Sequence, residues 1–190
     1  MLKDLVLAAR TYRKYDQTYE VKEESLRALI DVARFSNSST NSQALRYKIV
    51  CGQALVDRLF SITKWGMRYK DYSGPAQGER ATGYIVICCD TTIRAAASAG
   101  IDTGIVAELL VLAGWEAGLG SCMIGNFNRE KCREILELPE RFAPMLVIAF
   151  GKPADTIVLE EIDEGESTDY YRDENGVHHV PKRKLEDLLI

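Results

Sequence analysis

The sequence predicts a fold that mixes α-helices and β-strands, of the α+β or α/β class. Residues 83–90 (GYIVICCD) form a continuous apolar run, which is typical of a strand buried on both faces. Residues 22–35 carry apolar side chains at helical spacing, which predicts an amphipathic helix. The chain has 190 residues, 46% of them hydrophobic, which is enough for one well-buried core. We therefore expect a single domain over residues 1–190.

The other elements follow from the same patterns, taken in order along the chain. Further helices are predicted at residues 2–10, 53–63, 101–117 and 129–136, and further strands at residues 45–51, 121–127, 145–153 and 158–162. A loop is expected at 65–82, an acidic surface segment at 163–175, and a basic cluster with a short amphipathic tail at 177–190. The helix at 101–117 is apolar on nearly every side, so it should be buried in the core or against a second subunit.

Composition and charge argue against several classes of protein. A net charge of −4 and an isoelectric point of about 5.3 disfavour a nucleic-acid partner. No apolar run approaches the ~18 to 20 residues that span a bilayer, and the first residues are charged too early for a signal peptide. We therefore expect no membrane partner. Five cysteines, an odd number without a C-x-x-C pair, indicate buried thiols in a reducing cytoplasm.

Residues for hydrolytic or metal chemistry are scarce. The histidines are His178 and His179, and adjacent residues cannot both face one metal from a strand. We therefore predict no metal site and expect surface or interface histidines. The G-x-S-x-G elbow of many hydrolases is absent. The stretch GLGSCMIG lacks the third glycine of a dinucleotide fingerprint and follows a predicted helix instead of a strand.

Two polar features of the sequence are candidates for ligand binding. Residues 36–43 are eight consecutive Ser, Asn, Thr and Gln residues, which offer more hydrogen-bonding groups than a turn needs. Basic residues cluster near both ends of this acidic chain, at Arg10 and Arg13 and again at Lys182 and Arg183. If the two ends meet, they form a pocket for a phosphate, which Arg binds through charge-assisted bonds. Otherwise these residues are solvated charges at the termini.

Four motifs together resemble the FMN-dependent nitroreductase family. They are ARTYRKYD, SSTNSQALRY, IDTGIVAELLVLAGWEAGLGSCMIGNF and FGKP, and the likeness runs from about residue 5 to the final VPKRKLEDLL. The resemblance implies an α+β sandwich in which helices flank a mostly antiparallel central sheet. It also implies a homodimer, with FMN in a groove at the interface that both chains touch.

The resemblance also implies a role for each matching residue. Arg10 and Thr11 would hold the FMN phosphate together with Lys182 and Arg183, and Arg13 would approach the pyrimidine edge of the flavin. The polar run would bond the ribityl hydroxyls and the ring edge, and a turn further along would place a backbone N–H near flavin N5. The residues with these two roles would be Ser38, Ser39, Asn41, Gly125 and Asn126.

Two further observations concern the same site. Ala9 stands where many members of the family carry Arg, which removes one expected phosphate contact. Residues 65–80 are expected to cover the site, and Trp65, Tyr69 and Tyr72 are candidates for stacking on a planar substrate.

The reaction that the resemblance implies is a ping-pong hydride transfer. NAD(P)H would reduce the flavin at N5 and leave, and a nitroaromatic or quinone-like acceptor would take its place. Because the cofactor carries the chemistry, no catalytic side chain is expected, in agreement with the scarcity of histidine. The alternatives are a flavin-binding protein without turnover, flavin breakdown or dehalogenation on the same scaffold, and a structural dimer that has lost FMN.

Overall fold

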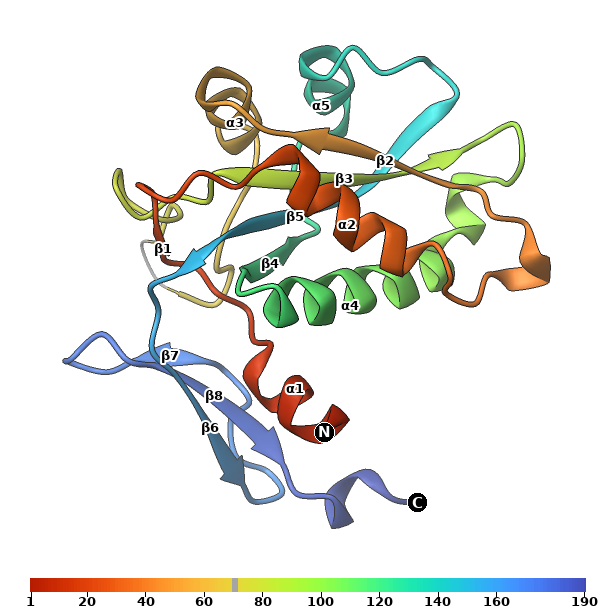
Figure 1. The fold of residues 1–190 in the computed structure, drawn as a ribbon. Helices are drawn as coiled ribbons and strands as arrows, with labels where there is room; N and C mark the ends of the chain where they lie inside the picture. The colour runs from red at the N-terminus through yellow and green to blue at the C-terminus, as the bar shows by residue number, and fades with distance from the viewer. Residues whose placement is uncertain (70–71) are drawn as a thin grey trace.

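A five-stranded sheet lies between two layers of helices in the computed structural model, which describes residues 1–69 and 72–190 (Figure 1). The strands are β1 (Tyr15–Asp16), β2 (Leu45–Val50), β3 (Gly83–Asp90), β4 (Gly120–Ile124) and β5 (Phe142–Pro153). Their order is β1-β5-β3-β2, with β4 also paired to β5, and each of these pairings is antiparallel. The α+β class with a mostly antiparallel central sheet is therefore confirmed.

Helices cover both faces of this sheet (Figure 1). On one face lie α2 (Glu23–Ala33) and α4 (Gly100–Glu116), and on the other lie α3 (Gln53–Phe60) and α5 (Arg129–Ile135). A short helix, α1 (Leu2–Ala8), projects beyond α4. All five helices predicted from the sequence are present, with ends that differ by a few residues.

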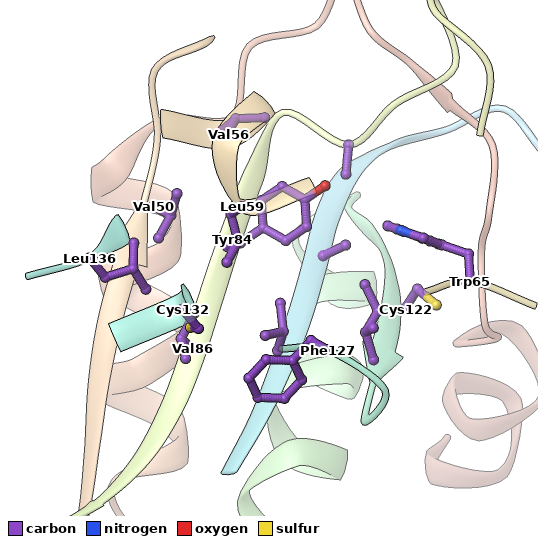
Figure 2. Close-up of a cluster of buried hydrophobic side chains, with 14 of the residues drawn as sticks. Val50, Val56, Leu59, Trp65, Tyr84, Val86, Cys122, Phe127, Cys132 and Leu136 are labelled. Carbon is purple, nitrogen blue, oxygen red and sulfur yellow. The ribbon is translucent and has the colours of Figure 1, made fainter. Parts of the chain in front are cut away.

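The apolar run of β3 packs against both helical layers. Tyr84 and Val86 point into the cluster under α3 and α5, where Leu59 also lies (Figure 2). Ile85 and Ile87 point into the cluster under α2 and α4. Because successive side chains of a strand alternate between faces, a strand between two apolar layers must be apolar at every position.

The chain segment after α1 lies directly on β4 and β5. The Tyr12 N–H donates to a backbone carbonyl of β4 at 2.8 Å, and Tyr15 pairs with the end of β5. A Cβ at Gly120 would lie 2.9 Å from Cγ of Tyr12, and one at Gly151 would lie 2.8 Å from Cδ1 of Tyr15. The two glycines therefore let the tyrosine rings reach the strand backbones, and this contact fixes the position of Arg13 between them.

After β5 the chain builds a second sheet beside α1, and we refer to residues 154–190 as the C-terminal lobe (Figure 1). Strand β6 (Ile157–Ile162) pairs in parallel with β8 (His178–Arg183), and β7 (Tyr171–Arg172) pairs antiparallel with the start of β8. The prediction of β6 is confirmed. The interpretation of residues 177–190 as a basic cluster with a tail was incomplete, because their first part is strand β8.

One face of α4 is open to solvent within a single chain. Val106, Ala107 and Leu110 are buried, whereas Ile101 is 78% exposed and Ile105 is 38% exposed. The helix is therefore covered by the core on one side only. No helix among residues 1–69 and 72–190 is both long and apolar enough to cross a membrane.

Candidate functional site

A pocket of about 420 Å³ lies where the N-terminal segment, α4, β4 and the C-terminal lobe meet. Its lining includes Arg10, Thr11, Arg13 and Lys182, so the structure brings the basic clusters from the two ends of the chain together. The remaining lining residues are Ala9, Glu108, Val111, Ser121, Met123, Tyr170, His178 and Val180. We refer to this cavity as the basic pocket.

The residues predicted to bind the phosphate differ in their hydrogen bonding and exposure. Arg10 donates to the backbone carbonyls of Ala9 and Val6, so part of its guanidinium group satisfies the end of α1. Thr11 and Lys182 are exposed. Arg183 follows Lys182 on β8 and is not part of the pocket lining, as expected because neighbouring strand residues point to opposite faces.

Arg13 is the buried cation of the pocket, with only 8% of its surface exposed. Its backbone N–H donates to Asp155 Oδ2 at 3.3 Å, and the Asp155 carboxylate also accepts two hydrogen bonds from Arg172, at 2.7 and 2.8 Å. The Arg13 side-chain atoms Nε and Nη1 are buried and have no partner among residues 1–69 and 72–190. Unpaired buried donors are rare in native proteins, so these two atoms call for a ligand or bound water.

The two histidines occupy different environments. His178 is buried inside the chain, at 1% exposure, which corrects the expectation that it lies on the surface. Burial, together with the positive charges of Arg13 and Arg172, lowers the pKa of His178 to about 4, so its imidazole is neutral at pH 7. By contrast, hydrogen bonding to Glu160 raises the pKa of His179.

Two serine residues of the polar run are held by a buried carboxylate, Asp102, at the start of α4. Ser38 Oγ donates to Asp102 Oδ2 at 2.9 Å, and the Ser39 N–H donates to Asp102 Oδ1 at 3.1 Å. Arg94 Nη2 donates to Ser39 Oγ at 3.0 Å. Asn41 is exposed and has a left-handed backbone, with φ 52°. Ser38 and Ser39 are therefore fixed by contacts with Asp102 and Arg94, whereas Asn41 is accessible.

This polar loop does not line the basic pocket of its own chain. Asp102 lies six residues before Glu108 and nine before Val111 on α4, and both of these residues line the pocket. At 1.5 Å of rise per residue, the separation along the helix is about 9 to 14 Å. Ser38 and Ser39, which bond Asp102, therefore lie near the start of α4 and, like Asn41, outside the pocket.

The predicted turn at Gly125 and Asn126 follows β4 directly. A Cβ at Gly125 would meet no atom within 4 Å among the described residues, so the space beside it is open. The Asn126 carbonyl accepts from the Lys64 N–H at 2.9 Å, and its side-chain Nδ2 lies 3.3 Å from Met67 Sδ. The turn therefore borders the segment that contains the predicted aromatic residues.

The three aromatic candidates line a groove of about 660 Å³ beside this turn. Trp65 is 3% exposed and donates from Nε1 to Thr63 Oγ1 at 2.9 Å, so it is mainly a core residue. Tyr72 donates from its hydroxyl to the Arg13 carbonyl at 3.3 Å. Tyr69 stands between this groove and Arg13, 5.8 Å from ring centroid to guanidinium carbon. The predicted covering loop at 65–80 includes residues 70 and 71, which lie outside the described part of the chain.

Comparison with known proteins agrees with this architecture. The model of the Nitroreductase family matches residues 6–152. A relative from Methanothermobacter thermautotrophicus, provisionally named NADH dehydrogenase/NAD(P)H nitroreductase, is 25% identical over 157 residues, which cover 80% of this chain and 77% of the relative.

Two solved structures share the fold. A nitroreductase family protein from Clostridium difficile is 25% identical, with a TM-score of 0.64 over 80% of this chain and 84% of its own. A provisionally named nitroreductase from Desulfovibrio desulfuricans, solved in complex with FMN, is 19% identical, with a TM-score of 0.69 over 100% of this chain and 95% of its own. With the family model spanning well over half of the sequence, the chain belongs to the nitroreductase family.

Proposed function

We propose that this protein is an FMN-dependent oxidoreductase that passes hydride from NAD(P)H to nitroaromatic or quinone-like acceptors by a ping-pong mechanism. The observation that carries the proposal is the basic pocket, in which Arg13 presents two buried N–H groups that have no partner within the described parts of the chain. Family membership supports the same reading.

The residues of the pocket fit the parts of FMN. Its volume falls within the range of about 300 to 1,000 Å³ typical of cofactor sites. Arg10, Thr11 and Lys182 supply donors and positive charge for a phosphate, whereas Arg183 points to the opposite face of β8 and is not assigned to this group. Arg13 supplies a desolvated cation for the pyrimidine edge of the ring. Bound FMN would supply the hydride-accepting and hydride-donating ring.

We propose in addition that the site is completed by a second copy of the chain. The polar loop with Ser38, Ser39 and Asn41 is too far along α4 to reach the pocket of its own chain. The open face of α4, which carries Ile101 and Ile105, is apolar and suited to bury against another protomer. A homodimer packed through this face would bring the polar loop of one chain towards the pocket of the other.

The side chains of the protein would bind and orient the cofactor and the two substrates. The open space beside Gly125 and the groove that includes Tyr69 and Tyr72 would receive NAD(P)H and then the acceptor. His178, the histidine in the pocket lining, is neutral and has no hydrogen-bond partner in the described structure, so we assign it no proton transfer. This arrangement suits a reaction in which the cofactor carries the electrons.

Flavin content is the first test. Protein purified after expression with riboflavin should show flavin absorbance bands, and the bands should return when flavin-free protein is mixed with FMN. NADH or NADPH should then bleach the bands, and a nitroaromatic compound should restore them. Protein that takes up no FMN at micromolar concentration would refute the proposal. Bleaching without reoxidation by any acceptor would support a flavin-binding protein without turnover, and loss of the flavin ring or of halide from a substrate would identify the other reactions.

A further inference from the structure

We infer that Tyr170 is a positioning residue for Arg13: its ring, presented by the C-terminal lobe, holds the Arg13 guanidinium in a fixed and desolvated orientation at the basic pocket. The part of this inference that concerns flavin rests on the proposed function. The part that concerns Arg13 does not, because it follows from contacts within the chain.

The first observation is the geometry around Arg13. Its guanidinium carbon lies over the Tyr170 ring, 4.6 Å from the centroid, and 5.8 Å from the centroid of Tyr69. The rings of Tyr69 and Tyr170 meet edge to face at 4.9 Å, and His178 lies 5.5 Å from Tyr170. Two rings from distant parts of the chain therefore lie against one cation, and His178 packs against both rings, which is the arrangement of a partial aromatic cage.

The second observation is how little else holds the Arg13 side chain. Nε and Nη1 have no hydrogen-bond partner within the described ranges, and no ion pair of 4.0 Å or less to Arg13 is found there. The Asp155 carboxylate accepts a hydrogen bond from the Arg13 backbone N–H, not from its side chain. Both of its oxygens also accept hydrogen bonds from Arg172. Stacking on the aromatic rings is thus the main contact that orients the guanidinium group.

The third observation is that the cage is anchored. Arg172 follows Tyr170 by two residues and forms the bidentate pair with Asp155, whose side chain is 1% exposed. Arg172 also donates to the Gly176 carbonyl at 2.8 Å, which closes the turn between β7 and β8. The buried pair therefore fixes the part of the lobe that carries Tyr170, and through it the face on which Arg13 lies.

A cation kept out of water interacts more strongly with a nearby negative charge than a hydrated one does. Tyr170 would therefore raise the effect of Arg13 on a bound flavin, whose reduction adds negative charge at the pyrimidine edge. Removing the ring leaves Arg13 in place as a charge but frees it to turn into solvent. We expect the reduced flavin to lose affinity relative to the oxidised flavin by about tenfold, which for a two-electron couple lowers the potential by about 30 mV.

The experiment compares Tyr170→Leu, Tyr170→Phe and the control Tyr171→Leu. Tyr171 follows Tyr170 directly as the first residue of β7 and stacks on His179 at 4.7 Å, so its loss removes an aromatic ring from the neighbouring position without touching Arg13. In flavin-free protein, the Nε–H signal of Arg13, assigned from its absence in Arg13→Lys, should be shifted upfield by the ring current. Tyr170→Leu should lose this shift, and the other two variants should keep it.

The potential of FMN-loaded protein is the second measurement. It should fall in Tyr170→Leu and stay unchanged in Tyr170→Phe and Tyr171→Leu. A trifluorinated phenylalanine at position 170 keeps the shape but weakens the negative ring face, so it should lower the potential even if Tyr170→Leu does not fold. An unchanged Arg13 signal in Tyr170→Leu, or an unchanged potential with the fluorinated ring, overturns the inference. Failure to bind FMN refutes the proposed function alone, because the Arg13 signal is measured without flavin.

Discussion

Replacing Lys182 by Ala should weaken FMN binding without affecting riboflavin. Lys182 lines the basic pocket from strand β8 and is the residue of the C-terminal lobe that brings a positive charge there. Its side chain is exposed, so the substitution leaves no cavity in the core. The expected loss is confined to ligands with a phosphate, because only the phosphate carries the charge that the ammonium group would meet.

The magnitude follows from the strength of a charge-assisted bond. Such a bond contributes about 1.5 to 3 kcal/mol, and an exposed ammonium group belongs at the lower end of that range. Since 1.4 kcal/mol corresponds to a factor of about ten, the FMN dissociation constant should rise by at least about tenfold. The effect should shrink as salt concentration rises, because the group is exposed to the solvent.

Arg183→Ala is the matched control for this prediction. It removes the same unit of charge one residue further along β8, at a position outside the pocket lining. Fluorescence titration of FMN and of riboflavin against both variants and the parent protein separates the effects. Equal weakening of FMN and riboflavin by Lys182→Ala would refute the assignment, since the lobe would then act by packing. Equal effects of the two variants would show that general electrostatics, and not a specific contact, holds the phosphate.

Three further outcomes are expected. Arg13→Ala should retain some FMN but lower its reduction potential, measured with reference dyes, and an unchanged potential would show that Arg13 does not face the ring. The free energy of unfolding should fall as pH drops from about 6.5 to about 4, because the pKa of His178 is depressed from 6.5 in the folded state and the unfolded chain binds the extra proton. His178→Asn should flatten this dependence in urea titrations, and an equal slope in that variant would assign the effect to other groups. Light scattering at micromolar concentration should give the mass of a dimer, whose interface should exceed about 2,000 Å², and the mass of a single chain would exclude an obligate pair.

The sheet and its helices could be predicted from the sequence because their patterns are local. The unbroken apolar run of β3 follows from burial on both faces, and the apolar α4 differs by one residue at each end from its prediction. In these elements, the spacing of the apolar side chains directly reflects which faces are buried.

Strand β8 could not be predicted in the same way. Its sequence, HHVPKR, has no apolar alternation and contains a proline. Pro181 is tolerated because β7 pairs only with His178 and His179, so the proline lies beyond the end of that ladder and has no partner on that side to lose. The strand is formed because it pairs with β6, and this pairing between separate segments cannot be predicted from the local sequence.

The candidate site likewise has features that could be predicted from the sequence and features that could not. Sequence motifs pointed to Arg10, Arg13 and Lys182, and the structure brings these three residues into one pocket. The burial of His178, the ring of Tyr170 over Arg13 and the hold of Asp102 on the serines were not foreseen. Each of them depends on residues more than sixty positions apart, or on a strand with no sequence pattern of its own.

The composition of the basic pocket has a consequence for the order of events during synthesis. Its first wall is made by residues 9–13 and its last by residues 170–182. At about 5 to 20 residues per second, a ribosome needs roughly ten to thirty seconds to travel from one wall to the other. During that interval Arg13 has emerged without the ring and the neighbouring strand that later enclose it. A ligand that needs both walls can therefore bind only after residues 170–182 have been made, well after Arg13.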